Sequence, residues 1–256
     1  MLVFGEKLNS SIPSTLKIYN ENNTEAIINL IKAQEEADYL DINTGLCSKE
    51  KEMMICVAEL CRKEGAKIML DSSNVNVLID VINNLKGDIF INSVTCKERI
   101  FEVLPLIKEY NAKVIALPIK DKVPQSLKER EENALIICDI LKKENINLNN
   151  IFFDILVQPI ATDPDSGPLT IDTLKLFKKM GLKTTCGLSN VSFGLPQRKM
   201  VNSYFLSILM ANGLDSVICD ITDMNIQKSI KITEMLTGED ECIEYVRWIK
   251  KSKENK

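Results

Sequence analysis

Short apolar segments recur along the chain, and patterns typical of helices lie between them. Segments such as VIALP (residues 114–118) and IFFDIL (residues 151–156) are almost continuously hydrophobic, as parallel strands covered on both faces tend to be. We interpret eight segments of this kind as strands: Leu2–Leu8, Tyr39–Asn43, Lys67–Ser72, Asp88–Val94, Lys113–Ile119, Ile151–Leu156, Lys183–Ser189 and Ser216–Thr222.

Helix signals separate these strands. Thr24, Ser48 and Thr170 are candidate N-terminal caps, and a glycine often precedes the next strand where a loop needs positive φ, as at Gly65, Gly87 and Gly181. Eight alternations of strand and helix predict a parallel α/β architecture, of which the (β/α)8 TIM barrel is the commonest eight-unit form. The length of 256 residues fits one such barrel of about 250 residues. We therefore expect a single domain over residues 1–256, with an open doubly wound sheet as the alternative.

The composition of the chain excludes some kinds of binding partner. The net charge of −4 argues against duplex nucleic acid, because phosphate binding needs a concentrated basic surface. No apolar run approaches the roughly 20 residues that span a bilayer, and the first residues, MLVFGEKLNS, lack a basic region followed by an apolar stretch. We expect a cytoplasmic protein with no membrane partner. The charged stretch 120–133 is expected to be a solvated loop and helix start, with a mobile lid as the alternative.

The reactive side chains limit the chemistry. The chain contains no histidine, which excludes imidazole acid–base catalysis, Ser–His and Cys–His nucleophiles, and imidazole metal ligands. Its eight cysteines form no C-x-x-C pair, so we expect reduced, mostly buried thiols and no protein-bound metal. The remaining candidates are carboxylates, amides, lysine, arginine or a cofactor.

Polar residues gather near the carboxyl ends of the predicted strands, where the catalytic residues of barrels lie. A strand that otherwise reads IFF-ILV gives no packing reason for the charge at Asp154. Taken singly, Asp41 or Asp220 could instead be a helix cap or turn residue. Together the set predicts a shared polar pocket: Glu6, Asn9, Asp41, Asn43, Asp71, Asn92, Asp154, Ser189, Asn190 and Asp220.

The composition of this pocket favours a particular kind of ligand. The chain has neither G-x-x-x-x-G-K-[ST] nor G-x-G-x-x-G, so a phosphate cradle is not its main feature. Carboxylates and amide oxygens match a flat heterocycle rich in N–H donors. The aminopyrimidinone edge of a pterin offers such donors and compensates the desolvation of buried carboxylates.

Several motifs occur together in one order: GEKLN at 5–9, DINTG at 41–45, LDSSN at 70–74, INSV at 91–94, FDILVQP at 153–159 and GLSNVSFGLPQR at 187–198. In these motifs the chain resembles the methyltetrahydrofolate-dependent corrinoid methyltransferases, which are part of the pterin-binding barrel superfamily. The resemblance extends over nearly the whole chain, and GLSNVS is its most specific element.

The resemblance implies roles for individual residues. Asp71, Asn92 and Asp154 would hold the pterin ring with Asp41 nearby, and Asn190 would be the catalytic residue that donates a hydrogen bond toward N5. Arg198 would lie at the folate-side surface. The pterin-binding set also includes Ser189, Glu6 and Asn9. Considered alone, GLSN would be a glycine-containing turn with Ser189 or Asn190 as a helix cap.

The same resemblance implies the activity: transfer of a methyl group between N5 of tetrahydrofolate and the cobalt of a corrinoid. The missing histidine implies that a separate protein carries the corrinoid, since the usual cobalt-ligand motif includes histidine. A departure after GLSNVS, where Phe193 is followed by Gly194-Leu195-Pro196, favours methyl catabolism, with transfer from methyl-Co(III) to tetrahydrofolate. The resemblance also implies a homodimer. The alternatives are a noncatalytic pterin- or folate-binding module and an enzyme like dihydropteroate synthase.

Overall fold

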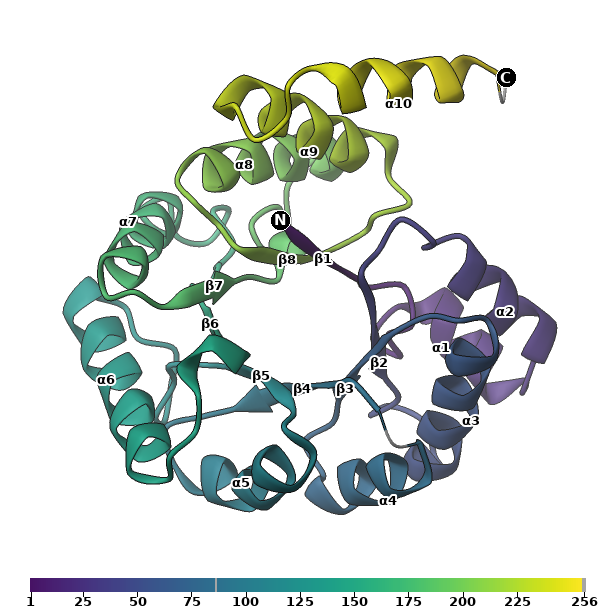
Figure 1. Cartoon of the computed structure of the whole chain (residues 1–256), viewed down its shortest axis with the longest axis vertical. Coiled ribbons are helices and arrows are strands. Elements are labelled where there is room, and N and C mark those ends of the chain that lie inside the picture. The colour runs from purple at the N-terminus through teal and green to yellow at the C-terminus, as the bar shows by residue number, and fades with distance from the viewer. Residues whose placement is uncertain (86, 255–256) are drawn as a thin grey trace.

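Eight parallel strands form a ring that is surrounded by helices in the computed structural model (Figure 1). The structure describes residues 1–85 and 87–254, and the side chains of residues 1–85 and 87–250. The strands pair in the order β7-β6-β5-β4-β3-β2-β1-β8. This arrangement confirms the predicted (β/α)8 barrel and excludes the open doubly wound sheet. The strands are β1 (Leu2–Gly5), β2 (Tyr39–Asn43), β3 (Ile68–Asp71), β4 (Ile89–Val94), β5 (Lys113–Ala116), β6 (Ile151–Asp154), β7 (Lys183–Thr185) and β8 (Ser216–Cys219).

Helices follow each strand and cover the outside of the ring. The connection after β1 holds two of them, α1 and α2, and α10 lies outside α9 at the end of the chain (Figure 1). The helices are α1 (Pro13–Asn20), α2 (Thr24–Lys32), α3 (Glu50–Lys63), α4 (Val75–Leu85), α5 (Glu98–Tyr110), α6 (Leu127–Lys143), α7 (Ser166–Lys179), α8 (Arg198–Ala211), α9 (Met224–Thr237) and α10 (Ile243–Glu254).

The ring closes between β7 and β8 with little backbone pairing. Among the described residues, this seam has one isolated bridge, Gly187 with Ile218, and the amide of Ile218 donates to the carbonyl of Cys186 at 2.8 Å. On its other side, β8 pairs with β1 over four residues. The seam also has a side-chain bond from Ser216 Oγ to the carbonyl of Thr184 at 3.1 Å.

All eight strands lie where the sequence predicts them, but six end earlier at the carboxyl side. β7 ends at Thr185 rather than Ser189, and a short 3₁₀ turn (Leu188–Asn190) follows it. β6 ends at Asp154, and Leu156 then adopts a left-handed φ of 56°. At these points the backbone turns out of the sheet, so the strands are shorter than their apolar patterns predicted.

The predicted helix starts need correction. Asn23, not Thr24, caps α2, and its side chain accepts a hydrogen bond from the amide of Ala26. Ser48 lies before α3, which begins at Glu50 without a side-chain cap bond. Thr170 lies inside α7, where burial is compatible with its hydroxyl because the hydroxyl donates to the carbonyl of Ser166 at 2.8 Å.

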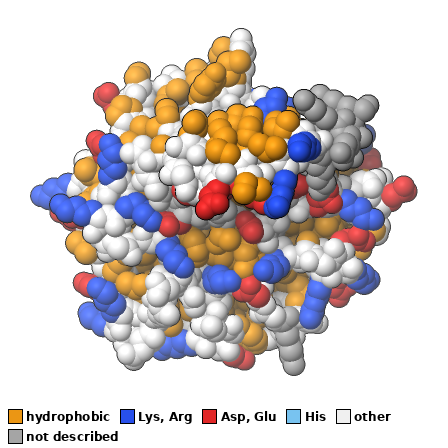
Figure 2. All heavy atoms as spheres, turned by 45° about the horizontal axis from the view of Figure 1, so that its top comes forward, with side chains coloured by type: hydrophobic (Ala, Val, Ile, Leu, Met, Phe, Trp, Pro, Cys, Tyr) orange, Lys and Arg blue, Asp and Glu red, His pale blue; other side chains and the backbone are white. Residues whose placement is uncertain are grey.

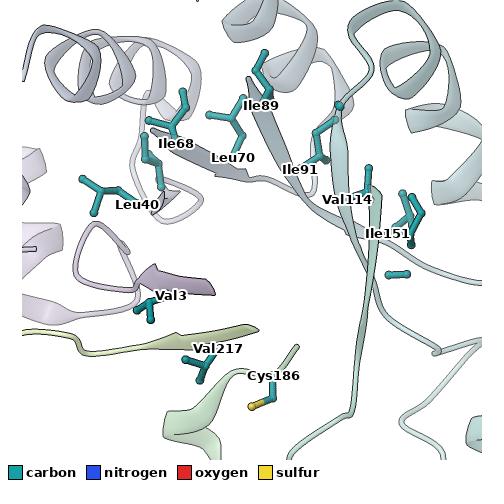
Figure 3. Packing of buried hydrophobic residues seen from close by; sticks show 14 of the residues in the cluster. Val3, Leu40, Ile68, Leu70, Ile89, Ile91, Val114, Ile151, Cys186 and Val217 are labelled. Atoms are coloured by element: carbon teal, nitrogen blue, oxygen red, sulfur yellow. The ribbon is translucent and has the colours of Figure 1, made fainter. Parts of the chain in front are cut away.

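Strand residues alternate between two cores. Those that point outward form the large core between sheet and helices, and Figure 3 shows Leu40, Ile68, Leu70 and Ile91 among them. Those that point inward form a smaller cluster inside the ring, which we call the apolar floor: Phe4, Tyr39, Met69, Phe90, Ile115 and Phe152. The ring centroids of Phe4 and Phe90 lie 4.9 Å apart at 80°, an edge-to-face contact that favours dense packing. The barrel interior is therefore filled at this level.

Candidate active site

A layer of polar side chains lies directly above the apolar floor. Because side chains alternate along a strand, the residue two positions after each floor residue also points inward, about 7 Å nearer the mouth. For five of the six floor residues, that position is polar. We call this set the polar layer: Glu6, Asp41, Asp71, Asn92 and Asp154. The structure thus brings the predicted strand-end residues to one end of the barrel.

Neighbouring strands β2, β3 and β4 contribute a connected group. Asp71 pairs in register with Asn43 and Asn92, and Asn43 Nδ2 donates to Asp71 Oδ2 at 2.9 Å. Burial raises the pKa of Asp41 well above its usual range, the negative charge of Asp71 raises it further, and the amide of Asn92 acts in the opposite direction. Asp41 Oδ1 is buried with no hydrogen-bond partner in the described structure. Burial also raises the pKa of Asp71, although the bond from Asn43 and the charge of Arg99 act to lower it.

Asp154 enters the layer from the opposite side of the ring. It is buried, and the amide of Leu156 donates to its Oδ1 at 2.6 Å. Burial raises the pKa of Asp154 to about 6, although this hydrogen bond and the nearby Arg130 act to lower it. At neutral pH, Asp154 is therefore an ionised acceptor inside the barrel.

The loop after β7 is tied to β1 and α8. Ser189 Oγ donates to Glu6 Oε1 at 2.7 Å, and burial raises the pKa of Glu6. Arg198 Nη2 donates to the carbonyl of Ser189 at 2.9 Å, and its Nε donates to Ser192 Oγ at 3.1 Å. The guanidinium also lies 5.9 Å from the ring centroid of Phe193. Arg198 is exposed as predicted, but it also fixes the GLSNVS loop.

Asn190 does not act as a helix cap. The next helix, α8, begins eight residues later after Gln197, and the side chain of Asn190 has no hydrogen bond within the described chain. This side chain is exposed and lines a cavity of about 630 Å³ at the mouth. The cap interpretation of GLSN is therefore wrong for both Ser189 and Asn190.

This cavity lies beside the polar layer, between the loops after β1, β7 and β8. Glu6, Asn9, Ser189 and Arg198 line it together with Asn190. The cavity thus joins the β1 and β7 parts of the predicted site, whereas Asp71, Asn92 and Asp154 lie deeper in the barrel.

Two predicted polar residues have local structural roles. Asn9 Oδ1 accepts from the amide of Ser11 at 2.8 Å, and Asp220 Oδ1 accepts from the amide of Thr222 at 3.1 Å. Asp220 also pairs with Lys7 at 2.5 Å. Asp220 is thus the turn residue that the sequence left as an alternative, although it lines the cavity as well.

Several residues of the site had no role predicted from the sequence. Asn43 was predicted as a pocket residue but given no role in pterin binding, although it points inward like Asp41 and bonds to Asp71. Thr185 lies opposite Asp154 in register, and its buried hydroxyl has no partner in the part of the chain described here. Arg99 and Arg130 bind the backbone directly after residues of the polar layer. Arg130 gave no signal because it lies in the stretch 120–133 that was predicted to be solvated, yet it is 1% exposed.

The cysteines, acidic residues and helices bear on metal binding and membrane insertion. Five cysteines are buried and all eight are free. Within residues 1–85 and 87–254, no group of three or more Cys, Asp or Glu side chains is placed to hold a metal ion, and no helix there is long and apolar enough to cross a membrane.

The chain is similar in sequence or in fold to several known proteins. The chain is 27% identical to methylcorrinoid:tetrahydrofolate methyltransferase of Eubacterium limosum, over 99% of this chain and 97% of that protein. It is 32% identical to methionine synthase of Mycobacterium leprae over 65% of this chain, but spans only 15% of that longer protein. Dihydropteroate synthase of Coxiella burnetii, solved with pteroic acid, has the same fold, with a TM-score of 0.72, 18% identity, and coverage of 93% and 94% of the two chains. The model of the family described as "Pterin binding enzyme" matches residues 13–220, and the chain therefore belongs to the pterin-binding enzyme family.

Proposed function

We propose that this protein is a methyltransferase that moves a methyl group between N5 of tetrahydrofolate and the cobalt of a corrinoid carried by another protein. The observation that carries the proposal is the polar layer, in a chain that aligns with a methylcorrinoid:tetrahydrofolate methyltransferase over almost its full length. The side chains of the polar layer point into the barrel, and the sequence motifs occur in one order along the chain. Both observations support a pterin as the ligand.

The polar layer suits the aminopyrimidinone edge of the pterin. The carboxyl oxygens of Asp71 and Asp154 can accept hydrogen bonds from the 2-amino group and ring N–H, and the amide of Asn92 can pair with the ring. Two buried oxygens that face this space, Asp41 Oδ1 and Thr185 Oγ1, lack partners in the described chain. Unpaired buried polar atoms are rare in proteins, and a polar ligand would satisfy them.

The transfer itself needs no nucleophile from the protein. In the proposed direction, the N5 lone pair attacks the methyl carbon, the Co–C bond breaks, both electrons stay on cobalt as Co(I), and N5 releases its proton. Asn190, exposed at the mouth, can direct its amide at N5, where charge changes during transfer. Such a preorganised dipole lowers the barrier without being consumed.

Methyl-Co(III) is the proposed donor, with tetrahydrofolate as acceptor. The name of the Eubacterium limosum relative describes this pairing, and Phe193 is 64% exposed at the mouth, where the incoming corrinoid protein would approach. A turnover assay tests the proposal: protein, methylcobalamin and tetrahydrofolate are mixed, and the cobalt spectrum is followed. Formation of Co(I) together with methyltetrahydrofolate is expected. Pterin binding without turnover, also with a methylated corrinoid protein, would instead identify a noncatalytic binding module.

Asn190→Ala tests the role of the mouth amide. Single-turnover transfer at saturating pterin is expected to slow by about 10²–10³, by analogy with removal of one preorganised donor, while pterin affinity falls much less. Thermal stability is expected to stay unchanged, since Asn190 caps no helix. An unchanged rate would remove Asn190 from the mechanism.

The homodimer remains a prediction, and an exposed apolar surface on α8 supports it. Met200, Tyr204 and Ile208 follow one another at four-residue spacing on α8 and are exposed, and they border an apolar groove of about 640 Å³ between α7 and α8. Figure 2 turns the side of α8, α9 and α10 forward and shows hydrophobic side chains gathered there. Tyr204→Glu is expected to yield monomers in light scattering, and a monomeric wild type would refute the dimer.

A further inference from the structure

Arg130 is a buried cation without an acidic partner. Its side chain reaches from α6 into the protein, and no carboxylate of the described chain lies within ion-pair distance of it. The guanidinium Nη1 donates to the carbonyl of Ile155 at 2.9 Å and to Thr173 Oγ1 at 3.0 Å. Nη2 donates to the carbonyl of Leu156 at 3.2 Å, and Nε to that of Pro124 at 3.3 Å. Burial lowers the pKa of Arg130 to about 10, so it stays charged at neutral pH.

These contacts hold the turn that follows Asp154. Leu156 has a φ of 56°, a left-handed conformation that is unfavourable by about 1–2 kcal/mol for a residue with a side chain. In this conformation its amide points back and donates to Asp154 Oδ1 at 2.6 Å. Because Leu156 is no glycine, neighbouring contacts must maintain the turn, and Arg130 binds the carbonyls of both residues in it.

Arg99 makes similar contacts with the backbone after β3 and β4, although it is only partly buried and also pairs with Glu102 at 3.4 Å. From α5, its Nη2 donates to the carbonyl of Ser72 at 2.6 Å, and its Nε donates to that of Ser93 at 3.3 Å. Ser72 follows Asp71, and Ser93 follows Asn92. Each guanidinium thus binds the backbone directly after residues of the polar layer.

We propose that Arg130 and Arg99 are positioning residues of the pterin site, acting through Asp154 and Asp71 respectively. This inference rests on the proposed function. Each arginine would fix the backbone that orients its carboxylate and place a positive charge behind it. In agreement, Arg130 opposes the effect of burial on the pKa of Asp154, and Arg99 does so for Asp71. Burying an unpaired cation such as Arg130 costs free energy, and the electrostatic role at Asp154 accounts for the presence of Arg130.

The test compares Arg130→Gln, which loses the charge, with Arg130→Lys, which keeps it. Binding of 5-methyltetrahydrofolate is measured by calorimetry between pH 5 and pH 8. In the wild type, affinity should fall below about pH 6 as Asp154 becomes protonated. In Arg130→Gln, the midpoint should rise by about one pH unit, which weakens binding about tenfold near pH 5.5. Arg130→Lys should restore the midpoint, even with reduced thermal stability. An unchanged midpoint in Arg130→Gln would overturn the proposal.

A milder pair of variants covers the case in which Arg130→Gln fails to fold. Thr173 and Thr170 are both buried in α7, and each hydroxyl bonds to the carbonyl four residues earlier. Only Thr173 also accepts from Arg130. Thr173→Val removes the hydrogen bond between Thr173 and Arg130. We expect the binding free energy of 5-methyltetrahydrofolate to fall by roughly half of the net free energy of one hydrogen bond, which weakens binding about threefold. Thr170→Val should leave binding intact. Equal binding by the two variants would argue against positioning.

A ligand-free measurement separates this inference from the proposed function. The carboxyl carbon of Asp154 is titrated by NMR in wild-type protein and in Arg130→Gln, or in Thr173→Val if that variant alone folds. A higher midpoint in the variant supports the link between Arg130 and Asp154 even if the wild type binds no 5-methyltetrahydrofolate, in which case the proposed function fails. Identical titration curves would refute the link itself.

Discussion

Replacing Asp154 by asparagine should stabilise the protein while it weakens pterin binding about ten- to a hundredfold. The asparagine side chain has the same shape, and its oxygen can still accept the hydrogen bond from the amide of Leu156. What disappears is an ionised carboxylate inside the barrel. Because the carboxylate is the proposed acceptor for pterin N–H groups, stability and binding should change in opposite directions.

The magnitude follows from the pKa of Asp154. Burial raises it to about 6 in the folded protein from an ordinary value of 3.8, a difference of about 2.2 pKa units worth about 1.4 kcal/mol each. A raised pKa means that Asp154 favours folding below about pH 4 and that this contribution is lost as the pH rises through 6. At pH 8, the asparagine variant should therefore be more stable by up to about 3 kcal/mol, or about 6–12 °C in Tm for a chain of this size. The value is an upper one because the new amide N–H group must find an acceptor.

Thermal or denaturant unfolding at pH 8, 6 and 4 measures the effect. The stability gain should be largest at pH 8 and vanish near pH 4, whereas calorimetry at pH 8 should detect binding of 5-methyltetrahydrofolate that is about ten- to a hundredfold weaker than in the wild type. Asp88→Asn is the control, because its change in stability at pH 8 should have the opposite sign. Burial acts to raise the pKa of Asp88, but bonds from Tyr39 and Lys113 outweigh it and lower that pKa, so this variant should lose stability at pH 8. A gain for Asp154→Asn that is equal at all three pH values would refute the reasoning.

Three further predictions concern the site, the backbone and the metal content. Asp71→Ala should weaken 5-methyltetrahydrofolate binding about ten- to a hundredfold in calorimetry, since loss of a charge-assisted hydrogen bond costs about 1.5–3 kcal/mol; wild-type affinity would contradict the pterin pocket. Gly5→Ala should lower the Tm, because a Cβ there would lie 2.6 Å from Gln34 Oε1, which accepts from the amide of Lys7; Gly167→Ala, whose Cβ meets only an ordinary contact at 3.6 Å, is the matched control. Metal analysis of the purified protein should find neither zinc nor cobalt, and about one ion per chain would disprove this.

The sequence predicted the barrel because its strands are buried on both faces and differ clearly from the amphipathic helices. It also predicted the polar layer, since Asp154 interrupts an apolar strand at an inward position. The ends of the strands were less predictable. Residues such as Leu188 and Leu156 are apolar and extend the strand pattern, but the backbone turns at or before them because tertiary contacts override local preference.

Arg130 and Arg99 show a second limit of prediction from the sequence. Arg130 lies in the segment KEREEN, where charged neighbours indicate solvent exposure, and five of its six residues are at the surface or only partly buried. Its burial depends on carbonyls in residues 124, 155 and 156, which approach it only after the barrel closes. A pattern of residue types cannot specify a backbone acceptor, so such a contact emerges only from the three-dimensional structure.

The weak backbone pairing between β7 and β8 has a consequence for dynamics. Local opening of a protein takes place where few backbone hydrogen bonds must break together, and this seam offers fewer than the continuous ladder between β3 and β4. Amide hydrogens near Ile218 should therefore exchange with solvent sooner than those of the β3–β4 ladder. The loop that carries Asn190 begins at the same seam, at Gly187. Fluctuation of the barrel wall and movement of the loop at its mouth would then belong to one cooperative unit, and a ligand that contacts Asn190 would slow exchange along the wall as well.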